Sequence, residues 1–295
     1  MLSLERTWVI ARYELTWDLR KKRTYIILGL FLFAAFVFGY LLPVIAGKSI
    51  ATGPNQLGVS FSSDLWWVLV HNLAFNIGVS GVFPLLIGGF IAADTIAAEF
   101  DKNTIVPLLS QPVSRAEVYG GKLLEKVLLL LVVSFLFTLL VIAGSEISVG
   151  AQSHLEMIPL VVFAEFGAFL EYTALAFLIG SLVRSGSMVL GVIITVFFVI
   201  LVTVLVLSAH FGEQESMFFL PMINADFLLK VIPYYIFQPW GVMVLQGYSI
   251  LAGSTLPVTV TVISAMEYVV AGLLANLAVA FFAGYYFFRR AEVGG

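Results

Sequence analysis

The sequence predicts an all-α membrane protein, and three observations carry this prediction. Of the 295 residues 61% are hydrophobic and only 11% are charged, whereas a soluble domain is about half apolar and a quarter charged. Six stretches are apolar over about 20 residues, the length that crosses a bilayer as a helix. None of them alternates as a barrel strand does, and backbone groups in lipid must be bonded within their own segment, so each is a predicted helix.

The same composition excludes several classes of protein. No polar stretch approaches the about 50 residues that a small independent fold needs, so neither a soluble enzyme nor a sizeable cytosolic domain is expected. The chain has no cysteine, which excludes disulfides, thiolate metal sites and cysteine nucleophiles. The three histidines, His71, His154 and His210, lie at no motif spacing. We therefore expect no catalytic, metal or cofactor-binding site on this chain, and no nucleic-acid partner.

The predicted membrane spans cover residues 25–46, 65–93, 122–145, 157–183, 186–211 and 268–288. The fourth span is interrupted by Glu165 and Glu171, whereas each of the others contains a long run without Asp, Glu, Lys or Arg. Residues 212–266 are predicted to form an extracellular segment with re-entrant or interface-lying helices, because Pro233, Pro239 and Pro257 are unfavourable in one straight helix. The whole chain, 1–295, is then a single transmembrane domain without a nucleotide-binding domain.

The distribution of basic residues predicts the orientation. With six spans, 13 of the 15 Lys and Arg residues fall on one side of the membrane, and only Lys48 and Lys230 fall on the other. Positive charge is enriched on the cytoplasmic side. We therefore expect a multi-pass protein of the cell membrane with both termini in the cytoplasm.

Residues 1–24 precede the first span and are predicted to form an amphipathic helix in the membrane surface. Leu4, Trp8, Leu15 and Leu19 fall on one face of such a helix. A plain basic leader that fixes the topology is the alternative.

The longest predicted cytoplasmic loop, residues 94–121, carries signals of defined structure. Asn103 is suited to end the incoming helix in a left-handed turn, and Pro107 and Pro112 restrict any helix in the loop to short pieces. Ser114 and Glu117 have the spacing of a capping box. A new helix is therefore predicted to start near Ser114 and to run through Lys122 into the third span.

Between these signals, Thr104–Ser110 is predicted to form a short apolar helix on the cytoplasmic side. Ile105, Leu108 and Leu109 have no lipid to contact there, which suggests a docking surface for another protein. Packing against the chain's own helices is the alternative.

Twelve residues in and beside this loop occur in a distinctive order: Glu99, Asn103, Thr104, Leu108, Leu109, Ser110, Pro112, Val113, Ser114, Arg115, Gly121 and Lys122. This order resembles the cytoplasmic loop of the type 2 ABC export permeases, in which an acidic residue, a Gly-Thr step, Leu-Leu-Ser/Thr, Pro-Val/Ile-Ser/Thr-Arg and Gly-Lys follow one another. Asn103 stands where glycine is usual, and asparagine tolerates the same left-handed backbone. The segments ARYELTWDLRKKR and LIGSLVRSGSMVLG are similar to the elbow helix and short intracellular turn of that family, within which the six-span group of the nitrous-oxide-reductase maturation permease is the most similar.

The resemblance implies a permease subunit that is not itself an enzyme. It implies that the chain pairs with a second copy or a related permease, contacts membrane lipid and sits on two separate ABC ATPase subunits, which hold the ATP and Mg²⁺; this chain holds no cofactor. The coupling residues that it implies are Glu99, Asn103, Thr104, Leu108, Leu109, Ser110, Pro112, Ser114 and Arg115. The implied function is ATP-driven export of a substrate.

Several polar residues lie within predicted spans. Asn72, Asn76 and Ser80 repeat at intervals of four residues beside His71. Because the resemblance places the second and fifth spans around the translocation route, this stripe is a candidate lining, with hydrogen bonds between helices as the alternative. The fifth span is otherwise mostly apolar, which favours a lipid-like or hydrophobic substrate. The candidate route residues are Asn72, Asn76, Ser80, Glu171, Thr195 and Thr203.

A carboxylate in the hydrocarbon core is costly unless it is paired or hydrated. Glu165 is expected at a wet outer interface, and Glu171 is expected to be protonated or bonded to a neighbouring helix. A structural hydrogen bond is favoured for both. A proton-coupled secondary transporter that uses Glu171 is the alternative function, and an intramembrane enzyme is a third.

Overall fold

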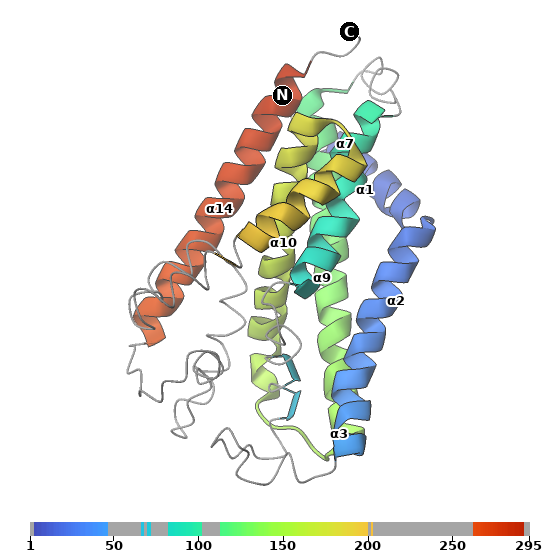
Figure 1. Ribbon diagram of the computed structural model, residues 1–295, viewed down its shortest axis with the longest axis vertical. Coiled ribbons are helices and arrows are strands. Elements are labelled where there is room, and N and C mark those ends of the chain that lie inside the picture. Colours follow the sequence, from blue (N-terminus) through green and yellow to red (C-terminus); the bar gives the residue numbers. More distant parts are fainter. Residues whose placement is uncertain are drawn as a thin grey trace.

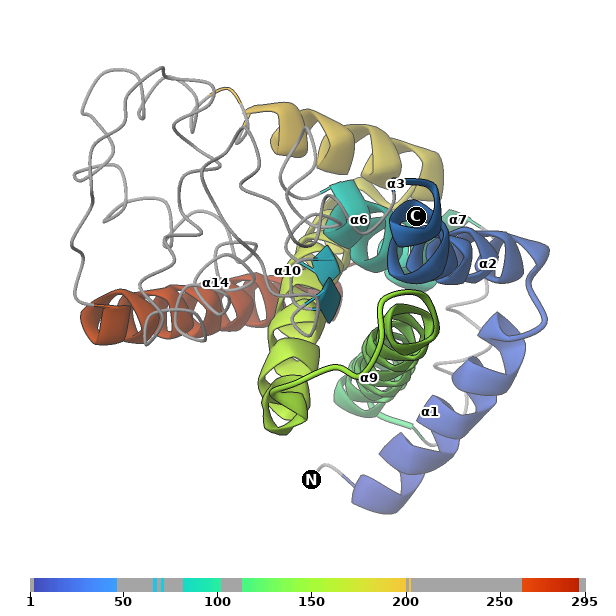
Figure 2. The same cartoon turned by 90° about the horizontal axis from the view of Figure 1, so that it is seen from below.

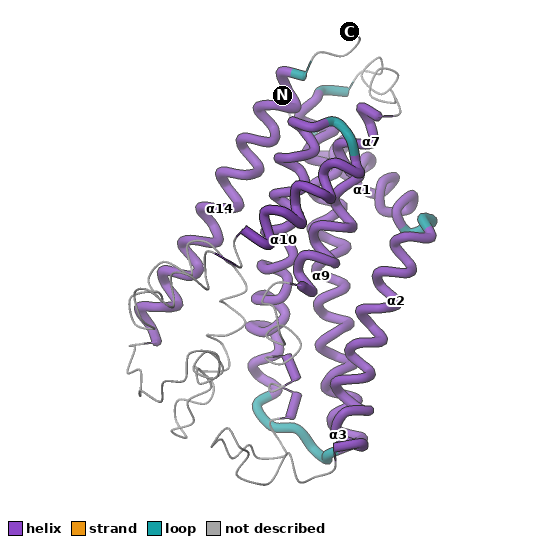
Figure 3. The backbone as a smooth tube through the Cα atoms, viewed as in Figure 1, coloured by secondary structure: helices purple, strands orange, loops and turns teal. Residues whose placement is uncertain are grey.

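The computed structural model describes residues 3–46, 66–67, 70–71, 82–101, 113–199, 202 and 262–291. Every secondary-structure element within these residues is a helix, as the sequence predicts (Figure 1). Four stretches are long and apolar enough to cross a membrane: Lys22–Ile45, Arg115–Ser148, Leu155–Val183 and Val270–Arg290. They correspond to the first, third, fourth and sixth predicted spans, and Figure 3 shows how their helices gather into one bundle.

Helix α1, Leu4–Asp18, begins at Ser3, whose side chain accepts a hydrogen bond from the backbone of Arg6. Viewed along the bundle in Figure 2, α9 is seen end-on while α1 is seen lengthwise, so α1 lies across the direction of the spans. The first span follows after three residues and consists of α2, Lys22–Phe36, a π-helical turn, Val37–Leu41, and α3, Leu42–Ala46.

The second predicted span is described only in part. It contains α6, Val82–Pro84, a π-helical turn, Leu85–Gly89, and α7, Phe90–Asp101. The sequence predicts one uninterrupted helix for this span, and the π-helical turn departs from that expectation. Pro84 lacks a backbone donor and two glycines follow it, so the regular hydrogen-bond ladder is weak at this point.

Helix α9, Arg115–Ser148, confirms the predicted capping box. The Ser114 hydroxyl accepts from the backbone of Glu117 at 3.2 Å, and the Glu117 carboxylate accepts from the backbone of Ser114 at 2.7 Å. The helix continues through Lys122 into the third span, as its N-terminal signal predicts.

Helix α10, Ile158–Val183, is the centre of the bundle and packs against α7, α9 and α14. It follows a short 3-10 turn, Leu155–Met157, and precedes an apolar helix, Gly186–Val199. Helix α14, Val262–Arg290, closes the described chain. Residues 262–266, which the sequence prediction gives to the extracellular segment, are the first residues of α14, so this helix begins before the predicted sixth span.

Two aromatic clusters fill the bundle. In the first, Phe31 of α2 stacks on Phe137 of α9 with ring centroids 4.3 Å apart and meets Phe169 of α10 edge-on. In the second, Tyr119 of α9 meets Phe177 of α10 edge-on and Phe288 of α14 at a tilt. These contacts fix α9 against its neighbours near its N-terminus, at Tyr119, and in its second half, at Phe137.

Candidate functional site

Lys122 of α9 directly follows the predicted coupling loop and joins three helices. Its Nζ lies 2.6 Å from Oε1 of Glu14 on α1 and 2.9 Å from Oε1 of Glu99 on α7. The lysine is buried, with 2% of its surface exposed. A buried ammonium requires such carboxylate partners, because it has lost its hydration shell. Lys122 therefore holds α1 and the end of α7 against the foot of α9.

A second lysine, one helical turn further along α9, repeats the arrangement. Lys126 forms ion pairs with Asp18 of α1 and with Glu125, the latter at 3.1 Å. Asp18 also pairs with Lys21 at 2.5 Å. Burial by itself raises the pKa of Asp18, but the charges of Lys126 and Lys21 outweigh it and hold the pKa below its usual value. We call Glu14, Asp18, Glu99, Lys122, Glu125 and Lys126 the anchor network.

The first residues of α9 also contact both ends of the described chain. Glu117 accepts a hydrogen bond from the backbone of Ser3 at 3.0 Å. Arg115 donates through Nη1 to the carbonyl oxygens of Phe288, Arg289 and Ala291 at 3.2, 2.6 and 2.8 Å. These carbonyls have no partner within an α-helix that ends there, so Arg115 caps the C-terminus of α14.

The last turns of α7 are held from other sides. Asp101 accepts from the backbone of Gly186 at 3.1 Å, at the start of the helix that follows α10. The guanidinium of Arg184 lies 5.3 Å from the ring centre of Phe100. Arg23 pairs with Asp94 at 2.5 Å. Residues 102–112 thus lie between two anchored points, the end of α7 and the start of α9.

The structure describes three of the nine predicted coupling residues, Glu99, Ser114 and Arg115, and places them at these two anchored points. The other six lie outside the described residues: Asn103, Thr104, Leu108, Leu109, Ser110 and Pro112. Sequence reasoning missed the partners in the anchor network. A signal for them does exist, because Glu14 and Asp18 are one helical turn apart before the first span, and Lys122 and Lys126 are one turn apart at the start of the third predicted span.

Residues 8–293, nearly the whole chain, match the family model described as ABC-2 family transporter protein. The chain belongs to the ABC-2 transporter family. It is a multi-pass membrane protein and a transmembrane component of an ABC transporter, and in this family that subunit is not itself catalytic. A comparison with curated proteins finds no significant match.

Within its spans, the ABC-2 permease buries a histidine against a glutamate. Nε2 of His71 lies 3.1 Å from Oε1 of Glu165 on α10, and the Thr138 hydroxyl of α9 lies 3.3 Å from both side chains. Glu165 has 0% of its surface exposed. The sequence prediction of a wet interface is therefore wrong for Glu165, because the side chain is buried beside His71 and Thr138. The Thr138 hydroxyl donates to Oε2, whereas Oε1 has no hydrogen-bond partner among the described residues.

A backbone carbonyl also holds the histidine. Nδ1 of His71 lies 2.6 Å from the carbonyl oxygen of Trp67, and a carbonyl only accepts, so Nδ1 carries a hydrogen. The other ring nitrogen, Nε2, lies beside the Glu165 carboxyl group and the Thr138 hydroxyl.

The other intramembrane predictions have separate outcomes. Glu171 of α10 accepts a hydrogen bond from Asn276 of α14 at 3.3 Å, which fits the expected bond to a neighbouring helix. Thr195 is exposed and donates to the carbonyl of Gly191 at 2.9 Å. Among the described residues, the two candidate route residues Glu171 and Thr195 thus bond to different partners and not to each other. The remaining candidate route residues, Asn72, Asn76, Ser80 and Thr203, lie outside the described residues. Within the described ranges, no three His, Asp or Glu side chains gather to hold a metal ion.

Proposed function

We propose that this ABC-2 permease is the membrane-spanning subunit of an ATP-driven exporter and that separate ATPase subunits dock on residues 102–112. The anchor network is the observation that carries this proposal. It ties the helix before the docking segment to the helix after it, and it ties both to α1. A displacement applied to the docking segment then moves α7, α9 and α1 as one unit.

The burial of the anchor network makes it suited to this transmission. Ion pairs are stronger where water is excluded, and long side chains held by several partners have little freedom left. A flexible surface contact would absorb a partner's motion, whereas a buried ionic contact passes it on. Arg115 extends the same unit to α14 through three carbonyl oxygens.

The proposal includes the arrangement that the sequence resemblance implies. The chain has six spans, with α1 as an elbow helix in the membrane surface and both termini in the cytoplasm of a cell-membrane protein. Two permease subunits pair and carry two ATPase subunits, which hold ATP and Mg²⁺. The substrate is lipid-like or hydrophobic, and Asn72, Asn76, Ser80, Glu171, Thr195 and Thr203 are the candidate route residues.

The test replaces the apolar docking residues and measures what remains bound. The double variant Leu108→Asp/Leu109→Asp should lose the ATPase subunits during purification in mild detergent, as read by native mass spectrometry. The matched variant Leu108→Met/Leu109→Met keeps an apolar surface and should retain them. Retention of the ATPase subunits by the aspartate variant would show that docking occurs elsewhere.

The same purification separates this proposal from its alternative, a proton-coupled secondary transporter that uses Glu171. Recovery of the unaltered chain without ATPase subunits, even after cross-linking, would favour the alternative. Transport should then depend on the proton gradient and lose this dependence in Glu171→Gln, whereas transport by an ATP-driven exporter should require ATP hydrolysis.

A further inference from the structure

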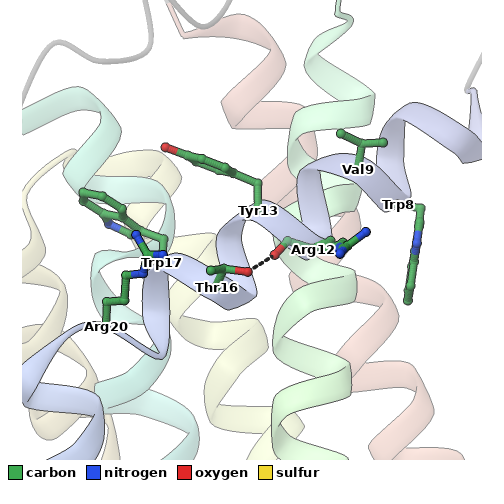
Figure 4. A pocket seen from close by; sticks show the side chains of 7 residues that line it. All are labelled: Trp8, Val9, Arg12, Tyr13, Thr16, Trp17 and Arg20. Carbon is green, nitrogen blue, oxygen red and sulfur yellow. Dashed lines mark hydrogen bonds between the residues drawn. The ribbon is translucent and has the colours of Figure 1, made fainter.

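Helix α1 carries a groove of 440 Å³ on the side that faces away from the bundle. Figure 4 shows its lining side chains projecting from α1, with the other helices behind it. Three aromatic residues, Trp8, Tyr13 and Trp17, line the groove together with Arg12 and Arg20. Trp8 and Arg12 belong to one row of the helix, Tyr13 and Trp17 belong to the next row, and Arg20 lies in the turn that follows α1.

On a soluble protein, a surface helix buries its apolar face and exposes its polar face. Helix α1 has the opposite arrangement. The face toward the bundle buries Thr7, Ala11 and Asp18, which are small or acidic. The outward face exposes Trp8, Tyr13 and Trp17 by 51%, 65% and 52%. An outward row of aromatic rings combined with arginines is the composition of a helix at the boundary between lipid headgroups and acyl chains.

The position of α1 along the chain places this groove at the membrane surface. Helix α1 ends at Asp18 and the first membrane-spanning stretch begins at Lys22. Three residues cover at most about 10 Å of extended chain. Trp17 and Arg20 are therefore within reach of the end of the span, at the level of the headgroups.

The charges of α1 are divided between its faces. Glu14 and Asp18 pair with Lys122 and Lys126 on the bundle side. Arg12 and Arg20 are exposed on the other side, and neither forms an ion pair with a carboxylate of the described residues. The groove therefore presents uncompensated positive charge beside apolar rings. Guanidinium groups match the oxygen geometry of a phosphate group closely.

We propose that this groove binds the headgroup of an anionic phospholipid in the adjoining leaflet. Arg12 and Arg20 bind the phosphate group, whose negative charge no cationic headgroup balances in such a lipid, and Trp8, Tyr13 and Trp17 contact the glycerol and the first methylene groups. Arg12 lies on α1 and Arg20 in the turn that follows it, and both line the same groove. The site does not depend on ATP coupling and stands independently of the transport function.

The experiment measures lipid binding to the full-length chain by native mass spectrometry. Delipidated protein is titrated with phosphatidylglycerol or with phosphatidylcholine of the same acyl chains. The unaltered chain should bind phosphatidylglycerol preferentially. Because each basic residue near an anionic surface contributes about five-fold in binding, Arg12→Gln/Arg20→Gln should weaken phosphatidylglycerol binding about thirty-fold. Its helix content should be unchanged, since both side chains are exposed.

A matched variant removes two arginines from the end of α14. Arg289→Gln/Arg290→Gln should keep the preference, although it loses the same charge. The proposal is wrong if Arg12→Gln/Arg20→Gln retains the preference, or if both double variants lose it equally.

Two further results would assign the groove to another ligand. If inorganic phosphate alone displaces the lipid, the arginines form a site for a free anion. Loss of ATPase subunits from Arg12→Gln/Arg20→Gln with unchanged lipid binding would make the groove a protein contact. Either result overturns the proposal.

Discussion

Replacing Lys122 by methionine tests the anchor network most directly. The substitution keeps the length of the side chain and removes the ammonium that Glu14 and Glu99 share. These carboxylates are 17% and 20% exposed, so water compensates them only in part. Removing one partner of a buried ion pair costs about 3–5 kcal/mol. Because some hydration remains, we expect Lys122→Met to lower the free energy of unfolding by about 3 kcal/mol.

A triple variant separates the lost charge from the lost contact. Glu14→Met/Glu99→Met/Lys122→Met replaces the whole ionic group by apolar side chains of similar size. Replacement of a buried ion pair by apolar side chains is often neutral or stabilising, so the triple variant should unfold within about 1 kcal/mol of the original protein. If the anchor network transmits motion, the assembled complex with this stable triple variant should still lose ATP-driven transport.

The assay is denaturant unfolding in detergent micelles, followed by tryptophan fluorescence. Lys22→Met is the matched control, because this lysine is exposed and should change stability by less than about 0.5 kcal/mol. Two results would refute the reasoning: a loss below about 1 kcal/mol in Lys122→Met, or a triple variant no more stable than the single one.

Three further predictions concern other parts of the bundle. A methyl group added at Gly88 would overlap the carbonyl oxygen of Phe169, so Gly88→Ala should lower the free energy of unfolding by about 1–3 kcal/mol. A methyl group at Gly29 meets nothing within 4 Å, so Gly29→Ala should not destabilise the protein. Equal thermal midpoints of the two variants would contradict this prediction. Glu165→Gln keeps an acceptor for the Thr138 hydroxyl and polar atoms beside His71, so it should unfold close to the original protein, whereas Glu165→Leu removes both and should cost about 1–3 kcal/mol. Unfolding titrations that rank the two variants the other way would disprove a structural role for this contact. The pKa of Asp18 in the folded protein lies below its usual value. Its ion pairs therefore stabilise the protein above the pKa of an unfolded aspartate, about pH 3.9. This contribution is lost as the pH falls through the lower folded-state pKa. Thermal midpoints measured down to about pH 3 should therefore fall less steeply for Asp18→Asn, and parallel curves would rule out this role.

Local signals were sufficient to predict much of the fold. The start of α9 depends on Ser114 and Glu117, which are three residues apart, and such a capping box is visible in the sequence. The length and hydropathy of the spans are equally local properties. For that reason the all-helical class and four of the spans agree with the structure.

The partners within the candidate site depend on tertiary contacts and were not predictable in the same way. Lys122 and Glu14 are separated by 108 residues, and either could pair with many oppositely charged side chains before the bundle forms. His71 gave no motif, because its meaning depends on Glu165 from another helix. The π-helical turn after Pro84 was missed since hydropathy does not distinguish one helical pitch from another.

The length of α9 has a mechanical consequence. Its 34 residues extend over about 51 Å, whereas the hydrocarbon core is about 30 Å thick. The helix is therefore about 21 Å longer than the core, and its N-terminal foot, which begins at Arg115, is the free end of a lever. A tilt of about ten degrees, pivoting at Ser148, would move Arg115 through about 9 Å and Lys122 through about 7 Å. Rigid side chains at the foot convert a small rotation within the membrane into a displacement large enough for a second protein to drive or to sense.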